Sequence, residues 1–251
     1  MSKKDTYLKL IIYTVTLVML YGYTMVEGSG YLILNTGAGQ NIESKEDNEN
    51  AAGNNVNDSL KYEQNRDTKK IAITFDDGPS GEYTEKLLDA LKERNVKATF
   101  FVLGEKAEEN EELILRMKNE GHLIGNHTYS HIRLTAVGDE EAMEEIAKTN
   151  DIIREITGDE TEYIRPPFGS YEKEHIRAEN MIVVLWDIDP KDWVTYDADK
   201  VAEDVINKAE DGQIILMHDI FDTSVDAAIK IIDTLIAEGY QFVTVEEILL
   251  D

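Results

Sequence analysis

The regular alternation of short apolar runs with amphipathic segments restricts the fold of this chain more than any other feature. The apolar runs have the length and composition of strands and occupy 71–75, 98–102, 122–126, 163–165, 181–186, 213–217 and 241–245. Between them lie segments with helical periodicity, among them 83–93, 111–119 and 139–157. Apolar strands separated by helices predict a parallel sheet that is buried on both faces. The pattern permits either an open doubly wound sheet or a barrel, because periodicity alone does not distinguish them.

The first 68 residues differ in composition from the rest of the 251-residue chain. Three lysines lie within the first nine residues, ahead of an uncharged apolar run at 10–26. Because that run is apolar on every face and follows positive charge, residues 1–30 are predicted to be a membrane anchor or a signal peptide. Residues 31–68 are rich in Asn, Asp, Glu, Gly and Ser, which predicts a disordered polar stalk. We therefore expect 69–251 to be one exported domain, held on the extracellular face of the membrane or secreted if the first segment is cleaved.

Charge and cysteine content exclude several classes of partner and site. The formal net charge of -26 argues against a nucleic-acid partner, because phosphate backbones are bound by clustered Lys and Arg. A neutral or cationic ligand fits this charge better. The chain has no cysteine, so disulfides, thiolate nucleophiles and cysteine-ligated metals are excluded. Any bound metal must be held by histidine and carboxylate side chains.

Polar residues follow five of the predicted strands at the point where each strand ends. These clusters are 76–77, 127–131, 165–169, 187–193 and 218–219. The carboxyl ends of parallel strands share one face of a β/α fold, so clusters that are distant in sequence are expected to converge there. This shared position predicts a functional site more strongly than any single cluster does.

The first two clusters contain candidate metal ligands. Asp76 and Asp77 begin the segment DDGP, whose residue types also form ordinary turns. Adjacent carboxylates repel each other, unless one binds a cation and the other accepts a proton. His127 and His131 are four residues apart, so a helical turn would bring both rings to one face, although such a pair is often only a solvated surface feature. Two histidines and one aspartate form the ligand set of a catalytic rather than a structural metal.

The remaining clusters contain candidates for positioning and substrate contact. Arg165 opens the rigid segment RPPFG and is either a surface charge or, in the cleft, a partner that orients Asp76. His218 ends a strand and is either a buried neutral histidine or, if a carboxylate holds it, a general acid. Trp186 is expected in the core, whereas Trp193 is expected in a groove wall that stacks on sugar rings.

Five segments, in this order along the chain, together carry the signature of a family. They are TFDDGP at 74–79, HTYSH at 127–131, RPPFG at 165–169, DPKDW at 189–193 and LMH at 216–218. The chain from roughly 69 to 251 resembles the polysaccharide deacetylases with a NodB-type domain, carbohydrate esterase family four. The resemblance implies an α/β fold, a distorted (β/α) barrel with fewer than eight strands.

The resemblance also implies an activity. It is that of a metal-dependent hydrolase, which removes N-acetyl groups from an aminosugar polymer, peptidoglycan or a chitin-like glycan, and releases acetate. An acetylxylan esterase on the same scaffold and a non-catalytic glycan-binding wall protein are the alternatives. The implied partners are an acetylated glycan and, through the N-terminal segment only, a membrane. The catalytic domain is expected to be monomeric.

Each motif residue receives a role from the same resemblance. Asp76 would be the general base, positioned by Arg165, and His218 the general acid, oriented by Asp192, although the choice among the aspartates of 187–192 stays open. A divalent metal, zinc or alternatively cobalt, would be held by Asp77, His127 and His131. Substrate contacts would come from Phe168, which replaces the tyrosine of many relatives, and from Gly169, Trp193 and Leu216. The other two histidines, His122 and His175, are expected to be structural.

Overall fold

The computed structural model of the chain describes residues 68–250. The predicted anchor or signal peptide at 1–30 lies outside these residues, and so does the predicted stalk at 31–68 except for its last residue. Within 68–250, no helix has both the length and the apolar character needed to cross a membrane.

Parallel strands form one sheet in the described part of the chain. In chain order they are β1 (Lys69–Asp76), β2 (Thr99–Val102), β3 (Leu123–Asn126), β4 (Tyr163–Ile164), β5 (Ile182–Val183), β6 (Gln213–His218) and β7 (Tyr240–Val243). Across the sheet the order is β5-β4-β3-β2-β1-β6, and β7 also pairs with β1. β7 pairs with Lys69–Ala72 of β1, and β2 pairs with Thr74–Asp76. The central strand β1 is therefore paired along both edges over most of its length.

One extended segment draws the two edges of the sheet together. It begins at β5, which pairs with β4, and continues to Ile188, which forms a parallel bridge with Ile215 of β6. The N–H of Leu216 donates to the carbonyl of Ile188 at 2.9 Å. The sheet is thus curled into a partly closed barrel, and the predicted distorted barrel with fewer than eight strands is confirmed. The predicted strand at 181–186 is shorter than expected, because the chain leaves β4 after two residues in order to reach β6.

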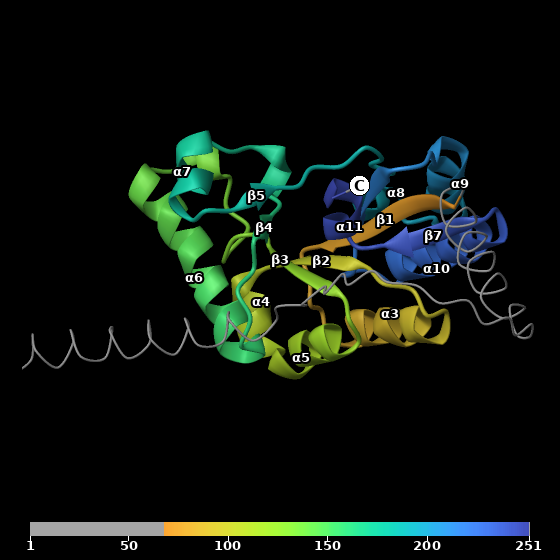
Figure 1. The fold of residues 1–251 in the computed structure, drawn as a ribbon, viewed down its shortest axis with the longest axis horizontal. Coiled ribbons are helices and arrows are strands. Elements are labelled where there is room, and N and C mark those ends of the chain that lie inside the picture. Colours follow the sequence, from red (N-terminus) through yellow and green to blue (C-terminus); the bar gives the residue numbers. More distant parts are fainter. Residues whose placement is uncertain (1–67, 251) are drawn as a thin grey trace, which may run out of the picture. The chain divides into compact units, whose positions relative to one another are not determined.

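Helices cover the outside of the sheet. They are α3 (Glu82–Glu93), α4 (Gly104–Glu109), α5 (Glu111–Asn119), α6 (Asp139–Thr157), α7 (Lys173–Ala178), α8 (Asp192–Thr195), α9 (Ala198–Lys208), α10 (Asp222–Ala237) and α11 (Val245–Leu250), with 3-10 turns η1 (Leu134–Ala136) and η2 (Pro167–Gly169). In Figure 1, α6 and α7 lie toward β4 and β5, whereas α9 and α10 lie toward β1 and β7.

Alternate side chains of β1 face two different cores, as the pleat of a strand requires. Ile73 packs outward into the cluster shared with α3 and α10, whereas Ala72 packs inside the barrel with Phe101. Val245, the first residue of α11, belongs to the same interior cluster, and its N–H donates to Thr99 Oγ1 at 3.1 Å. Because Thr99 is the first residue of β2, α11 covers the end of the barrel where the strands begin. The opposite end, where the strands finish, is left for the polar clusters.

Long periodic elements match the sequence prediction better than short ones. α6 has the predicted bounds, and Gly158 follows it with a φ of 76°, the left-handed conformation that often ends a helix. α3 and α5 lie within one residue of their predicted ranges. The short helices α4, α7, α8 and α11 have only four to six residues, too few for a periodic pattern.

Candidate active site

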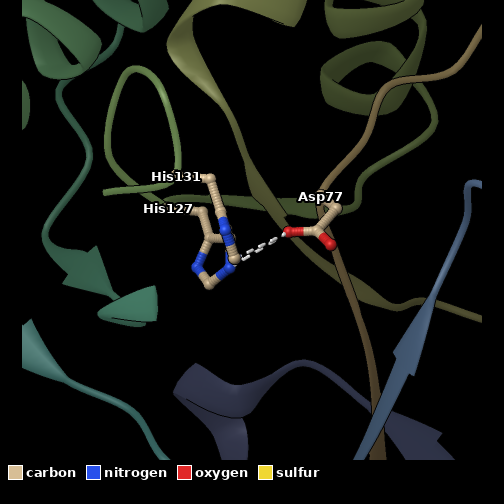
Figure 2. Close-up of side chains that lie close together, drawn as sticks. All are labelled: Asp77, His127 and His131. Carbon is tan, nitrogen blue, oxygen red and sulfur yellow. Dashed lines mark ion pairs between the residues drawn. The ribbon is translucent and has the colours of Figure 1, made fainter. Parts of the chain in front are cut away.

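Asp77, His127 and His131 lie together where β1 and β3 end. Nε2 of His127 and Nε2 of His131 each lie 3.3 Å from Oδ1 of Asp77. Figure 2 shows both rings turned toward this carboxylate. One potential ligand atom from each residue lies within 4.8 Å of the other two. The structure thus brings the three predicted ligands close enough to share one ion.

The two histidines converge through a loop, so the predicted helical turn is wrong. Residues 127–131 contain no helix, and Thr128 and His131 have positive φ values of 67° and 59°. The loop is held instead by other elements, because the N–H of Gly104 donates to Thr128 O at 3.0 Å. Nδ1 of His127 pairs with the carbonyl of Arg165, which leaves Nε2 directed at Asp77.

The Asp77 carboxylate fits a metal ligand better than an ordinary buried aspartate. Its Oδ1 atom is buried and has no hydrogen-bond partner among the described residues. Buried carboxylate oxygens are normally paired, so an unpaired oxygen that faces two imidazoles is a place for a cation. Burial raises the pKa of Asp77, but His127, His131 and His218 together outweigh burial and lower it to about 2. These residues therefore fit a divalent metal.

Asp76 belongs to the same strand end but has a different partner. Nη1 of Arg165 donates to Asp76 Oδ1 at 2.8 Å and to Thr74 Oγ1 at 2.6 Å. The fully buried guanidinium also donates to the carbonyls of Val184 and Leu185, each at 3.1 Å. Burial lowers the pKa of Arg165, and the Asp76 carboxylate opposes that change. The second carboxylate oxygen of Asp76, Oδ2, lies 3.7 Å from Nε2 of His127.

His218 is held by Asp192, the first residue of α8. Nδ1 of His218 lies 2.9 Å from Oδ1 of Asp192, and the N–H of His218 donates to Oδ2 at 2.9 Å. Asp187 and Asp189 accept backbone N–H groups of other residues, so Asp192 is the aspartate of 187–192 that contacts His218. Burial lowers the pKa of His218, but Asp192, with help from Asp76 and Asp77, outweighs burial and raises it to about 9. In the metal-free protein, a pKa in this range keeps the imidazole protonated at neutral pH.

The acid, base and ligand candidates open into one cavity of about 500 Å³. Much of its wall is apolar or aromatic, formed by Pro166, Phe168, Trp186, Trp193, Leu216, Ile220 and Phe221. Phe168 and Trp193 are 57% and 47% exposed, so both rings are available to a ligand. Trp186 is only partly buried and lines the cavity, which corrects the expectation that it belongs to the core. Gly169 is not among the residues that line the cavity, but a Cβ added to it would lie 3.3 Å from Trp186, which does.

The turn after Asp77 is fixed by Asp219, a member of the polar cluster at 218–219 for which the sequence predicted no role of its own. Asp219 is fully buried, and a Cβ added to Gly78 would lie 2.2 Å from its carboxylate. Thr84 Oγ1 donates to Asp219 Oδ2 at 2.5 Å, and Ser80 Oγ donates to the carbonyl of Asp219 at 2.6 Å. Burial raises the pKa of Asp219 to about 6. Its position beside His218 was the only available signal, because Thr84 is 135 residues away in sequence.

The other two histidines lie outside the cavity. Nδ1 of His122 accepts the N–H of Ala98 at 3.1 Å, and burial lowers the pKa of His122 to about 4. His175 is buried as well, with Nε2 at 3.0 Å from Asp139. Each ring has one nitrogen paired within the described residues, and both lie apart from the ligand set.

Comparison with known proteins identifies the family to which this geometry belongs. Residues 63–182 match the family described as polysaccharide deacetylase. The solved structure of peptidoglycan deacetylase PdaC from Bacillus subtilis aligns with a TM-score of 0.72 and 43% identity, over 73% of this chain and 91% of that one. The chain belongs to the polysaccharide deacetylase family. The family resemblance drawn from the five motifs is therefore confirmed.

Two relatives differ in the share of their own length that aligns with this chain. The peptidoglycan-N-acetylmuramic acid deacetylase PdaC of Bacillus subtilis is 44% identical over 180 residues, which are 72% of this chain but only 38% of that protein. A peptidoglycan-N-acetylglucosamine deacetylase of Bacillus cereus is 34% identical over 199 residues, 76% of this chain and 92% of that protein. The chain thus spans less than half the length of the first relative and nearly all of the second.

Proposed function

We propose that this polysaccharide deacetylase is a metal-dependent hydrolase that removes N-acetyl groups from the aminosugars of peptidoglycan and releases acetate. The observation that carries the proposal is the meeting, in one cavity, of a ligand set, an arginine-held aspartate and an aspartate-held histidine. Amide hydrolysis needs these parts: an electrophile, a proton acceptor and a proton donor. The names of the two relatives support peptidoglycan as the glycan.

Asp76 and His218 have the surroundings of a base and an acid. Arg165 occupies Oδ1 of Asp76, so Oδ2 is the oxygen that accepts the proton of the attacking water. Asp192 holds Nδ1 of His218, so Nε2–H is the group that donates a proton to the departing amine. The backbone N–H of Phe168, on the cavity wall with a φ of 61°, is proposed to stabilise the oxyanion of the acetyl carbon.

We propose that Asp77, His127 and His131 hold zinc, for which cobalt can substitute. Two imidazoles and one carboxylate suit a borderline-soft divalent ion and leave a coordination position for substrate or water. When bound there, the ion would polarise the acetyl carbonyl and lower the pKa of a water molecule. Removal of metal with a chelator should abolish acetate release, and added zinc or cobalt should restore it.

The wall of the cavity suits a sugar polymer. Trp193 and Phe168 present partly exposed rings, on which the apolar faces of pyranose rings can stack. Leu216 lies in the same wall, close to His218 in sequence, and we propose that it contacts the acetyl methyl group. A chain of sugars in this groove would place one acetyl group beside the candidate base and acid.

We also propose that the domain works outside the cell membrane as a monomer. The support is the apolar run at 10–26 behind three lysines, together with a substrate that lies outside the membrane. Protease added to intact cells should then remove the domain, while a cytoplasmic protein in the same cells should survive. Protection of both proteins would contradict an extracellular location.

Acetate release from three glycans tests the activity. Isolated peptidoglycan, chitin oligomers and acetylated xylan are incubated with the protein and zinc, and each product is analysed by mass spectrometry. Peptidoglycan is expected to lose about 42 mass units for each aminosugar from which an acetyl group is removed. Release from xylan alone would indicate the acetylxylan esterase. Binding of glycan without any release, with zinc, cobalt or manganese present, would indicate a non-catalytic wall protein.

A further inference from the structure

Arg133 contacts a residue of the cavity wall and has no role in the proposed chemistry. The guanidinium carbon of Arg133 lies 4.2 Å from the ring centroid of Phe168, which lines the cavity. The same ring also contacts His131, whose own ring centroid lies 4.9 Å away. Phe168 therefore contacts both Arg133 and one of the candidate metal ligands.

The backbone that carries Arg133 is firmly anchored. Leu134, the next residue, is fully buried in a hydrophobic cluster beneath the loop. Thr135 Oγ1 lies 2.7 Å from Ser170 Oγ, which ties this loop to the loop of Phe168. The stack of guanidinium on phenyl ring is thus supported from both sides, and a charged group held in this way loses little freedom when it binds.

The side chain of Arg133 has no carboxylate partner within residues 68–250. It is exposed, and the ion pairs of the described residues engage Arg94, Arg116, Arg154 and Arg165 but not Arg133. A guanidinium that contacts an aromatic ring through its cation–π interaction still has N–H groups to donate to an anion. In a chain of net charge -26, such a free fork at the site is available for a negative group on the substrate.

We infer that Arg133, stacked on Phe168, selects glycans that carry a carboxylate next to the sugar being deacetylated. This inference rests on the proposed function and narrows its substrate class. A neutral chitin-like chain offers Arg133 no anion, whereas the lactyl ether of muramic acid, or a peptide attached to it, does. The cavity is lined by Asp76, Asp77 and Asp189, whose negative charges would repel a substrate carboxylate. Such a carboxylate is better placed beside Phe168, next to Arg133, than deeper inside the cavity.

A matched pair of substrates tests the inference. Glycan strands freed of peptide carry one lactyl carboxylate per muramic acid, and amidation with methylamine neutralises these groups without changing the sugars. Arg133→Gln should lower kcat/KM on the carboxylate strands by about tenfold, mainly through KM, which is the size of one charge-assisted hydrogen bond. On the amidated strands and on chitotetraose, the same variant should match the native enzyme within about twofold.

Control variants separate charge from support of the ring. Lys92→Gln removes one charge from the last turn of α3, where Lys92 pairs with Glu120. This variant should leave kcat/KM unchanged on every substrate. Arg133→Lys keeps the charge but loses the planar fork, and should recover part of the loss on carboxylate strands. An equal loss of kcat/KM on charged and amidated strands would show that Arg133 only supports Phe168. An unchanged kcat/KM on both would show that Arg133 has no part in substrate selection. Either result overturns the inference.

Calorimetric binding of the two strands to native and Arg133→Gln protein gives the same comparison without turnover. A failure of the proposed activity therefore remains distinguishable from a failure of this inference.

Discussion

Asp76 and Asp77 are adjacent in the chain but have different neighbours. Asp76 is fixed by the Arg165 guanidinium, whereas Asp77 faces His127 and His131 with a buried oxygen that has no hydrogen-bond partner among residues 68–250. Asp77 also has a φ of 70°, which turns the two side chains into different surroundings. The strained backbone at Asp77 therefore separates the function of a ligand from the function of a base.

Removal of a ligand and removal of the base should have separable effects. Asp77→Asn, His127→Ala and His131→Ala should each lower bound metal and acetate release together, because each removes a ligand. Asp76→Asn should retain the metal and lose about 10² to 10⁴ in rate, because an amide cannot accept the water's proton. Elemental analysis of purified variants, beside acetate release, measures both quantities. Loss of metal in Asp76→Asn with retention in Asp77→Asn would reverse the two assignments.

The pKa of His218 should depend on Asp192. In the metal-free protein, His218 has a pKa raised to about 9 by its hydrogen bond to Asp192, and Asp192→Asn should bring this pKa down toward its ordinary value of 6.5. The measurement is an NMR titration of the imidazole. A raised pKa stabilises the folded state at low pH, so this contribution to the free energy of unfolding should be complete below pH 6.5 and lost as pH rises through about 9. An unchanged titration in Asp192→Asn would show that another group holds the proton.

At the scale of elements, α4 supports the loop that carries both histidines. The N–H groups of Gly104 and Glu105 donate to the carbonyls of Thr128 and Tyr129 at 3.0 and 3.1 Å. A Cβ at Gly104 would lie 2.7 Å from the Tyr129 ring, nearer than real Cβ contacts allow. The close approach of α4 to this loop therefore requires glycine.

Gly104→Ala should weaken metal binding without touching a ligand. The added methyl group would lie 2.6 Å from Thr149 Oγ1 and 2.7 Å from the Tyr129 ring, and movement of Tyr129 would shift the loop between His127 and His131. We expect a rise of about tenfold or more in the metal dissociation constant and a lower melting temperature, since overpacking costs about 1–3 kcal/mol. Gly138→Ala is the matched control, because an added Cβ there meets nothing within 4 Å. Equal metal affinity in both variants would show that α4 does not position the ligands.

The sequence predicted elements and site residues to different extents. Apolar runs and the 3.6-residue period located β1, β2, β6 and α6, because these signals are local. The shape of the loop at 127–131 was missed because Thr128 and His131 have positive φ, and the bonds from α4 to Thr128 and Tyr129 that hold the loop are not local in sequence. The contact of Thr84 with Asp219 was also invisible, since it joins residues 135 positions apart. Sequence motifs thus predicted which residues lie together in the site, whereas contacts between distant segments determine the backbone conformation that brings them together.

At the scale of the whole molecule, Arg165 links the closure of the barrel to the chemistry. Its guanidinium donates to the carbonyls of Val184 and Leu185, within the segment that crosses from β5 to β6. These carbonyls lie where the sheet is not continuous, so a side chain supplies the hydrogen bonds that a neighbouring strand would otherwise supply. The same group holds Asp76, and therefore the position of the base depends on how the barrel closes.

The autonomy of the domain should depend on where β1 begins. Lys69–Ala72 pair with β7, and Ile71–Asp76 pair with β6, so the ladder of the central strand starts at Lys69. A fragment of residues 69–251 should therefore fold, unfold cooperatively and bind one metal ion, because it retains every strand pair of the sheet. A fragment that starts at Ile73 loses the whole β1–β7 ladder and should not fold, since backbone groups and apolar side chains of β7 would lose their partner. Thermal unfolding followed by circular dichroism, with metal content, compares the two fragments. If the longer fragment is unfolded while the full chain is folded and active, residues before Lys69 contribute to the fold and the domain boundary is wrong.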